Sequence, residues 1–185
     1  CGDDAVCGGD RGRGDGVGAM KTAVLICPGR GTYGKGELGS LAGFADRPLL
    51  AQFDAERARL GQETLSALDG ATSYSVAQHT RGDNASALIY ACTLGDRLAL
   101  GGVQLVAITG NSMGWYSALA CAGALSALDG FSVVNTMGTL MQEALIGGQL
   151  VYPIMGEDWV DAPARRAELL ALVDEIGDCP GHALA

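Results

Sequence analysis

Gly110-Asn111-Ser112-Met113-Gly114 is the stretch that decides the fold of this chain. It follows an apolar run at residues 103–108 and opens a stretch of small and apolar residues at 115–125. We therefore expect a strand, a sharp turn with serine at its apex, and a helix. Glycine on both sides suits a strained and tightly packed backbone. This pattern favours Ser112 as an acyl-forming nucleophile, and a purely structural turn is the alternative.

Short apolar runs alternate with helical patterns along the rest of the chain. Residues 23–27 and 103–108 are expected to be strands buried on both faces, as in a parallel sheet. A third strand is expected at residues 150–154, and Ser126 with Asp129 is expected to cap a helix. The other helices are expected at residues 48–60, 84–100, 127–146 and 163–176. This alternation predicts an α/β fold.

The composition predicts a globular chain that does not bind nucleic acid. The 185 residues are 48% hydrophobic and 18% charged, as expected for a protein with a core. The net charge of −9 disfavours a nucleic-acid partner. No apolar run is long enough to span a membrane, so no membrane partner is expected. Six cysteines and two histidines show no zinc-type spacing, so we expect no metal and a reducing, cytoplasmic compartment.

The two ends of the chain differ from the part between them. Residues 1–19 are rich in Gly, Asp and Arg, and we expect a disordered tail that is not native, with Met20 as the natural start. Residues 20–146 are expected to form the main subdomain. Residues 147–185 are expected to begin a second, smaller subdomain that is truncated.

The loop Gly29-Arg30-Gly31-Thr32-Tyr33-Gly34 matches the G-x-G-x-x-G pattern of dinucleotide-binding proteins in outline. Pro28 separates it from the expected strand, and the acidic residues that follow, Asp54 and Glu56, lie in a helical pattern. Nucleotide binding is therefore disfavoured, and no cofactor is expected. Two interpretations stay open: a turn-rich loop, or a loop that donates a backbone N–H to an oxyanion hole.

A serine nucleophile needs a base that accepts its proton. His79 lies in a polar segment and His182 lies near the last residue. We expect both at the surface, where neither would serve Ser112. The base is therefore expected beyond Ala185, and the 185-residue chain alone is expected to be inactive or very slow.

These motifs in combination resemble the malonyl-CoA:acyl-carrier-protein transacylases, the acyltransferases of fatty-acid and polyketide synthesis. Cys27-Pro28-Gly29-Arg30-Gly31 is similar to that family's Phe-Pro-Gly-Gln-Gly. Residues 110–119 are similar to its Gly-His-Ser-x-Gly-Glu-Tyr-Ser-Ala-Leu, and residues 122–126 and 140–144 continue the match without a gap. The resemblance runs from about residue 21 to 146 and suggests a divergent N-terminal portion of the family.

The resemblance implies an α/β-hydrolase-like parallel sheet with a ferredoxin-like small subdomain, which is incomplete here. It implies that Ser112 takes an acyl group from acyl-CoA and passes it to the phosphopantetheine thiol of an acyl carrier protein. The backbone N–H groups of Met113 and Arg30 would form the oxyanion hole. The residues that would line the substrate site are Gly31, Asn111, Trp115 and Met137.

Some of these positions depart from the family pattern. The family's histidine before the serine is Asn111 here, and its glutamate after the motif is Trp115. The family's arginine, which binds the free carboxylate of malonyl, aligns with Met137, and methionine cannot form that ion pair. The substrate is therefore malonyl-CoA bound by another cation, or an uncharged acyl-CoA. A serine thioesterase or esterase, and a non-catalytic protein that binds CoA or a carrier, are the alternatives.

Overall fold

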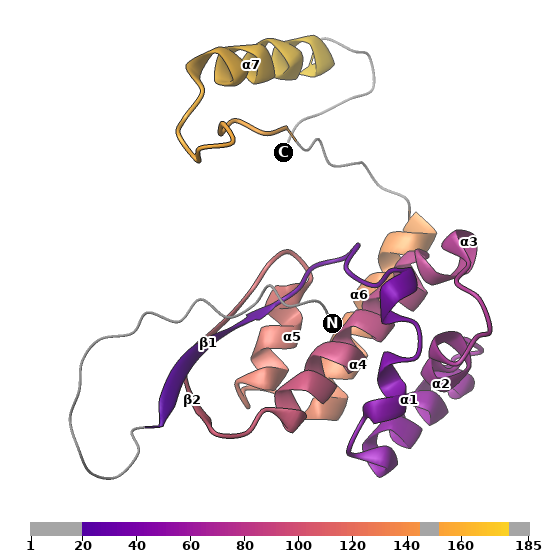
Figure 1. The fold of residues 1–185 in the computed structure, drawn as a ribbon. Coiled ribbons are helices and arrows are strands. Elements are labelled where there is room, and N and C mark those ends of the chain that lie inside the picture. Colours follow the sequence, from indigo (N-terminus) through magenta and orange to yellow (C-terminus); the bar gives the residue numbers. More distant parts are fainter. Residues whose placement is uncertain (1–19, 145–151, 178–185) are drawn as a thin grey trace, which may run out of the picture. The chain divides into compact units, whose positions relative to one another are not determined.

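The computed structural model describes residues 20–144 and 152–177 of the chain. The chain divides into two compact units, one ending at Leu145 and the other beginning at Ile146, and each is considered by itself (Figure 1). The expected tail at residues 1–19 lies outside the described residues. Within the described ranges, none of the helices combines the length and the apolar character needed to cross a bilayer.

A parallel pair of strands, β1 (Lys21–Cys27) and β2 (Val103–Gly110), forms the sheet of the first unit. Lys21 pairs with Val103 and Cys27 with Gly110, with a β-bulge after Ala23. The α/β class and the positions of both strands are confirmed, whereas the hydrolase-like and ferredoxin-like details stay predictions. Because the parallel strands end at the same edge of the sheet, the loop after Cys27 and the turn after Gly110 meet there.

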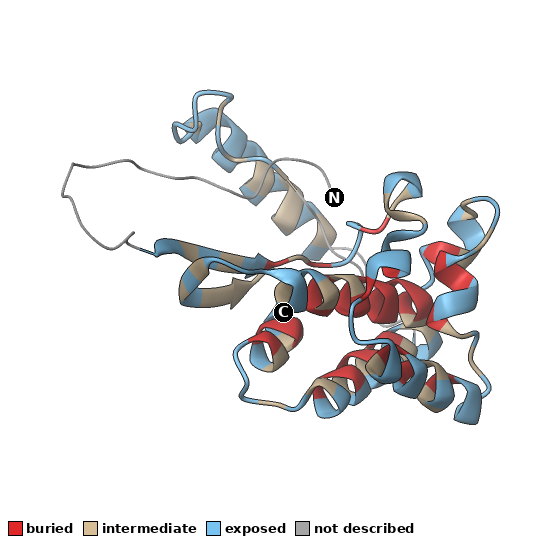
Figure 2. Cartoon of the chain, turned by 60° about the horizontal axis from the view of Figure 1, so that its bottom comes forward, coloured by how far each residue is buried: buried red, intermediate tan, exposed pale blue. Residues whose placement is uncertain are grey.

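One face of this sheet is exposed, so the prediction of strands buried on both faces is wrong for the described residues. Val24 is 48% exposed, Ile26 66% and Val106 60%, whereas Cys27 is fully buried. Helix α5 (Gly114–Cys121) contacts both strands, and more and less exposed side chains alternate along β1 (Figure 2). An apolar run shows that a strand avoids polar residues. It does not show whether another element packs against each face of that strand.

Helices make up most of the first unit, and the predicted ones begin within two residues of their expected positions. Ser126 Oγ accepts a hydrogen bond from the backbone N–H of Asp129 at 3.1 Å, which confirms the predicted cap. The longer helices besides α5 are α1 (Arg47–Arg59), α4 (Gly82–Ala99) and α6 (Ala127–Ala144). The short elements are η1 (Lys35–Glu37), η2 (Ser40–Gly43), α2 (Leu65–Asp69) and α3 (Val76–His79).

An aromatic cluster joins α1, α4 and α6 in the core. The ring centroids of Phe53 and Phe131 lie 4.3 Å apart and nearly parallel, and Tyr90 lies 5.9 Å from each of them. The Tyr90 hydroxyl donates to the carbonyl oxygen of Ala127 at 2.6 Å. The cluster therefore buries large apolar rings while its one hydroxyl keeps a partner.

Arg57 is a fully buried cation that links α1 to α4 and α6. Its guanidinium donates to Asn135 Oδ1 at 2.7 Å, to Asn84 Oδ1 at 2.6 Å and to the carbonyl oxygen of Asp83 at 2.8 Å. Burial lowers the pKa of Arg57 from its ordinary value. Neutral oxygens therefore satisfy this buried charge, and losing one of them would leave part of it without a partner.

Helices α4 and α6 approach closely at a pair of glycines. The carbonyl oxygen of Gly82 lies 2.6 Å from the position that a Cβ on Gly138 would occupy, and Ser86 Oγ lies 2.9 Å from it. The backbone N–H of Gly82 donates to Gln142 Oε1 at 2.8 Å. The contact therefore requires a residue without a side chain at position 138.

The described part of the second unit contains helix α7 (Pro163–Gly177), which confirms the helix predicted there. An isolated antiparallel bridge joins Met155 to Asp161. Residues 152–154 are not a strand, so the strand predicted at 150–154 is wrong for these residues, while 150–151 lie outside the described ranges. Trp159, between the bridge partners, has a φ of 61°. The chain turns back at this point instead of extending.

The close contact of α4 and α6 predicts that Gly138→Ala destabilises the fold. Overpacking at such a contact costs about 1–3 kcal/mol, although alanine is the better helix former by about 1 kcal/mol. Urea unfolding of both proteins would measure the loss in free energy of unfolding. Gly36→Ala is the matched control, because no heavy atom lies within 4 Å of the position of its Cβ. A Gly138→Ala variant more stable than the parent chain by the full helix-propensity gain of about 1 kcal/mol would contradict the contact.

Candidate active site

Ser112 occupies a strained position at the apex of the turn between β2 and α5. Its φ is 52°, a left-handed conformation that a residue with a Cβ rarely adopts. The Ser112 side chain is exposed. The sequence predicted a strained turn here with its hydroxyl clear of the sheet, and the positive φ confirms the strain.

The two glycines that flank the turn allow it to lie directly on the end of β1. A Cβ on Gly114 would lie 2.1 Å from the carbonyl oxygen of Cys27, and one on Gly110 would lie 2.1 Å from the carbonyl carbon of Gly114. The backbone N–H of Asn111 donates to the same Cys27 oxygen at 3.0 Å. No other residue type fits at positions 110 and 114 without moving the backbone.

The loop after β1 lies beside Ser112. A Cβ on Gly29 would lie 3.3 Å from Ser112 Cβ and 2.8 Å from the carbonyl oxygen of Asn111. Further along the loop, Thr32 Oγ1 donates to the carbonyl oxygen of Gly29 at 3.0 Å. The loop is therefore a turn with its own hydrogen bond, and its N-terminal end contacts the serine turn.

A buried carboxylate, which sequence reasoning missed, holds the far end of this loop. The hydroxyl of Tyr33 donates to Asp69 Oδ1 at 2.6 Å, and the backbone N–H of Leu41 donates to Asp69 Oδ2 at 2.9 Å. Burial, together with this hydrogen bond, raises the pKa of Tyr33. Asp69 lies 36 residues beyond Tyr33, and no motif in the sequence signals the pairing.

The two predicted oxyanion donors come from the two loops that meet at this edge. Met113 is buried at the start of α5, and Arg30 is in the loop after β1. Within the described residues, neither the N–H of Met113 nor that of Arg30 donates a hydrogen bond to another backbone group. Their joint role as an oxyanion hole stays a prediction.

The predicted substrate-lining residues are distributed over several elements. Asn111 and Trp115 flank Ser112 and are exposed, Trp115 to 59%. Gly31 is in the loop after β1 with a φ of 95°. Met137 is half-buried on α6. The structure therefore brings the loop residues and the serine turn to one edge of the sheet, whereas Met137 comes from a separate helix.

His79 is a structural residue, so the prediction of a surface position is wrong. Its side chain is fully buried, and its Nε2 lies 3.0 Å from the carbonyl oxygen of Leu68. Its Nδ1 lies 3.1 Å from the backbone N of Ser75, and its ring stacks on Tyr74 with centroids 4.8 Å apart. Nδ1 also lies 2.9 Å from the carbonyl oxygen of Ser75, so backbone groups contact both ring nitrogens. His182 lies outside the described residues.

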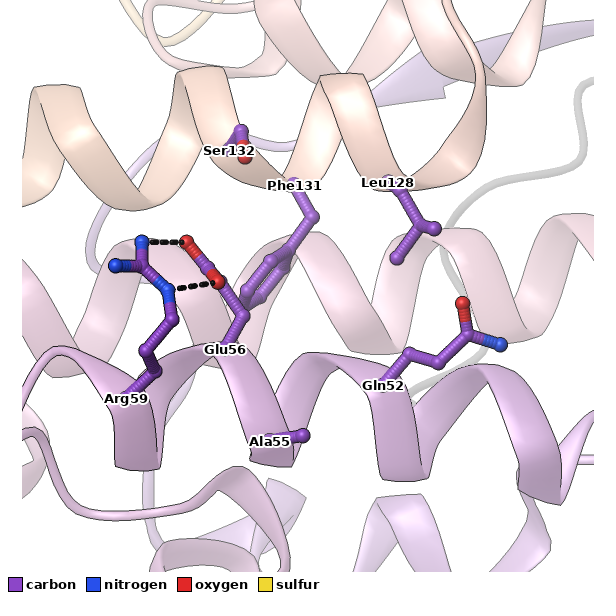
Figure 3. Close-up of a pocket in the computed structure, with 7 residues that line it drawn as sticks. All are labelled: Gln52, Ala55, Glu56, Arg59, Leu128, Phe131 and Ser132. Atoms are coloured by element: carbon purple, nitrogen blue, oxygen red, sulfur yellow. Dashed lines mark hydrogen bonds and ion pairs between the residues drawn. The ribbon is translucent and has the colours of Figure 1, made fainter.

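A groove of about 410 Å³ lies between α1 and α6 and contains none of the predicted site residues (Figure 3). The Arg59 guanidinium pairs with the Glu56 carboxylate in it through two hydrogen bonds of 2.8 Å. Its lining residues are Gln52, Ala55, Glu56, Arg59, Leu128, Phe131 and Ser132. Elsewhere in the described ranges, no three His, Cys, Asp or Glu side chains gather in a way that could hold a metal ion.

Fold and turn together define an α/β protein with a strained serine between a strand and a helix. No family model matches the chain. FabD from Acinetobacter baumannii is similar, with 28% identity and a TM-score of 0.57 over 86% of this chain. The malonyl-CoA:ACP transacylase of Synechocystis sp. PCC 6803 is similar, with 26% identity and a TM-score of 0.52 over 68%. These matches confirm the resemblance to malonyl-CoA:acyl-carrier-protein transacylases, from which this chain diverges.

A curated protein adds a local match. The polyketide biosynthesis protein ThaF of Burkholderia thailandensis is 44% identical over 70 residues, which is 38% of this chain. This chain spans 6% of that protein, 49% of the Acinetobacter structure and 41% of the Synechocystis structure. The activity, substrates and partners of the whole proteins therefore come to this chain only as proposals.

The positive φ of Ser112 predicts that Ser112→Gly is more stable than Ser112→Ala. Both variants lack the hydroxyl, but only glycine adopts this conformation without strain. Glycine also loses more backbone entropy on folding, so the net advantage of Ser112→Gly in free energy of unfolding is about 0.5–1 kcal/mol. Chemical unfolding would measure the difference. The same pair at Ser132, an exposed position on α6, serves as control and should show the opposite order by about 1 kcal/mol. If the Ala variant were the more stable one at position 112 as well as at position 132, strain at Ser112 would be contradicted.

Proposed function

We propose that this chain carries the nucleophile of an acyl-CoA:acyl-carrier-protein S-acyltransferase of the malonyltransferase type. The strained Ser112, exposed between β2 and α5 with a second loop beside it, is the observation that carries the proposal. The malonyl-CoA:ACP transacylase of Synechocystis supports this reaction type. We propose a role in fatty-acid or polyketide synthesis, and the polyketide biosynthesis protein ThaF supports the second of these.

The proposed reaction has two transfers through one covalent intermediate. Ser112 Oγ attacks the thioester carbonyl of acyl-CoA, loses its proton to a base and forms an acyl-serine, while CoA leaves as its thiol. The phosphopantetheine thiol of an acyl carrier protein then attacks the acyl-serine, and Ser112 recovers its proton. The N–H groups of Met113 and Arg30 would stabilise the negative oxygen in both transition states.

We propose the remaining roles from the resemblance to the transacylases. Gly31, Asn111 and Trp115 would border the acyl-CoA thioester, and Met137 would lie near its acyl end. We propose that the first unit is an α/β-hydrolase-like subdomain and that the second unit belongs to a ferredoxin-like one. The cysteines in the described ranges are free thiols, which supports the proposed cytoplasmic compartment.

The proposal predicts a covalent acyl adduct on Ser112. After incubation with malonyl-CoA or acetyl-CoA, intact-protein mass spectrometry should show a mass increase that peptide mapping assigns to Ser112. The Ser112→Ala variant should show none, while Ser117→Ala, which removes a buried hydroxyl on α5, should keep the adduct. An adduct that persists in Ser112→Ala would refute the assignment. Free CoA released without an adduct would favour hydrolysis, as in a thioesterase.

The buried His79 predicts that the 185-residue chain acylates slowly without added base. A positioned general base contributes about 10²–10⁴-fold, and His79 already uses both ring nitrogens. Added imidazole should accelerate acylation of the parent chain and leave Ser112→Ala unmodified. We would follow adduct formation over time at several imidazole concentrations. Rapid acylation that imidazole does not change would place a working base within these 185 residues.

A further inference from the structure

We propose that the Arg30 side chain binds the free carboxylate of the acyl group, which makes a carboxylated acyl thioester of the malonyl type the preferred donor. The inference rests on the proposed function and specifies its substrate class. It assigns two roles to one residue, because the backbone N–H of Arg30 is the proposed oxyanion donor and its guanidinium would be the anion receptor.

Arg30 starts beside the serine turn, and its guanidinium lies at the N-terminal end of α4. Arg30 follows Gly29, whose Cβ position lies 3.3 Å from Ser112 Cβ. Its Nη1 lies 3.5 Å from the position that a Cβ on Gly82 would occupy. The side chain therefore extends from the serine toward the N-terminal end of α4.

The same location is where α6 meets α4. The carbonyl oxygen of Gly138 lies 3.0 Å from the Cβ position of Gly82 that Arg30 approaches. Met137 is the neighbour of Gly138 on α6 and carries no charge. Arg30 thus supplies a positive charge where α4 meets α6, and Met137 on α6 supplies none.

The charge on Arg30 is not neutralised by any described residue. Its side chain is exposed and has no ion pair or hydrogen bond within residues 20–144 and 152–177. The nearest acidic residue along α4, Asp83, is held by Arg81 through contacts of 3.1 and 3.0 Å. A guanidinium with a free fork matches a carboxylate in shape and charge.

An acyl-CoA offers two kinds of anion, the carboxylate of the acyl group and the phosphates of CoA. The acyl carboxylate of malonyl-CoA is one carbon away from the carbonyl that Ser112 would attack, whereas the pantetheine arm separates the phosphates from it. Because Arg30 directly follows Gly29, the residue beside Ser112, we assign it to the acyl carboxylate and not to the phosphates. Acyl-pantetheine donors, which lack the phosphates, distinguish the two sources.

The test compares Ser112 acylation by malonyl-CoA and acetyl-CoA in the parent chain and in Arg30→Gln. Loss of a charged hydrogen-bonded pair should lower the malonyl-to-acetyl ratio of acylation rates by about 10- to 100-fold. The ratio with malonyl- and acetyl-pantetheine should fall equally. Arg30→Gln/Met137→Arg should recover part of the ratio, because it places a cation on α6 next to Gly138. Arg81→Gln, a nearby exposed arginine paired with Asp83, is the control and should keep the parent ratio.

Other outcomes separate this inference from the proposed function. An unchanged ratio in Arg30→Gln, with the Ser112 adduct still formed, overturns the role of Arg30 alone. Equal losses with both acyl-CoA donors and none with the pantetheine donors assign Arg30 to the CoA phosphates and also overturn it. No adduct in the parent chain with any donor refutes the proposed function itself. Circular dichroism and thermal unfolding of Arg30→Gln would confirm that the variant is folded.

Discussion

The contact between the serine turn and the last residue of β1 is the constraint on which the first unit depends. The carbonyl oxygen of Cys27 accepts the N–H of Asn111 and lies where Gly114 leaves no room for a Cβ. Because this backbone contact joins two strands, a turn and a helix, it fixes their order around the sheet edge. Ser112 cannot relax from positive φ without breaking it, so the strain is maintained by packing elsewhere.

The second loop at this edge depends on contacts far from it in sequence. Asp69 receives hydrogen bonds from Tyr33 and from the backbone of Leu41, and so holds the segment that follows Arg30. The stacking of His79 on Tyr74, whose hydroxyl donates to the carbonyl oxygen of Tyr33, supports the same segment. The position of the loop beside Ser112 is thus set by a buried polar network, in which each lost partner leaves a costly unpaired group.

Sequence patterns that span a few residues predicted the strands, helices and caps that depend on neighbouring residues. The run before Gly110 gave β2, and Ser126 with Asp129 gave the beginning of α6, because periodicity and capping act within a few residues. The burial of His79 depends on contacts with Leu68 and Ser75. The polar residues next to His79 in the sequence indicated a surface position instead. The exposed face of β1 could not be predicted either, because apolar side chains such as Ile26 do not encode which element covers them.

The departures from the family pattern at Asn111, Trp115 and Met137 are side chains at exposed or half-buried positions. Asn111 and Trp115 lie outside the core, so their replacement has little effect on folding. The carboxylate site that we propose rests on a loop side chain. Among the residues that the structure describes, the exposed Arg30 has no partner that holds its rotamer, and ordering it on a ligand costs up to about 2 kcal/mol. A carboxylate site built on this residue would therefore discriminate less strongly than one whose arginine is already held in place.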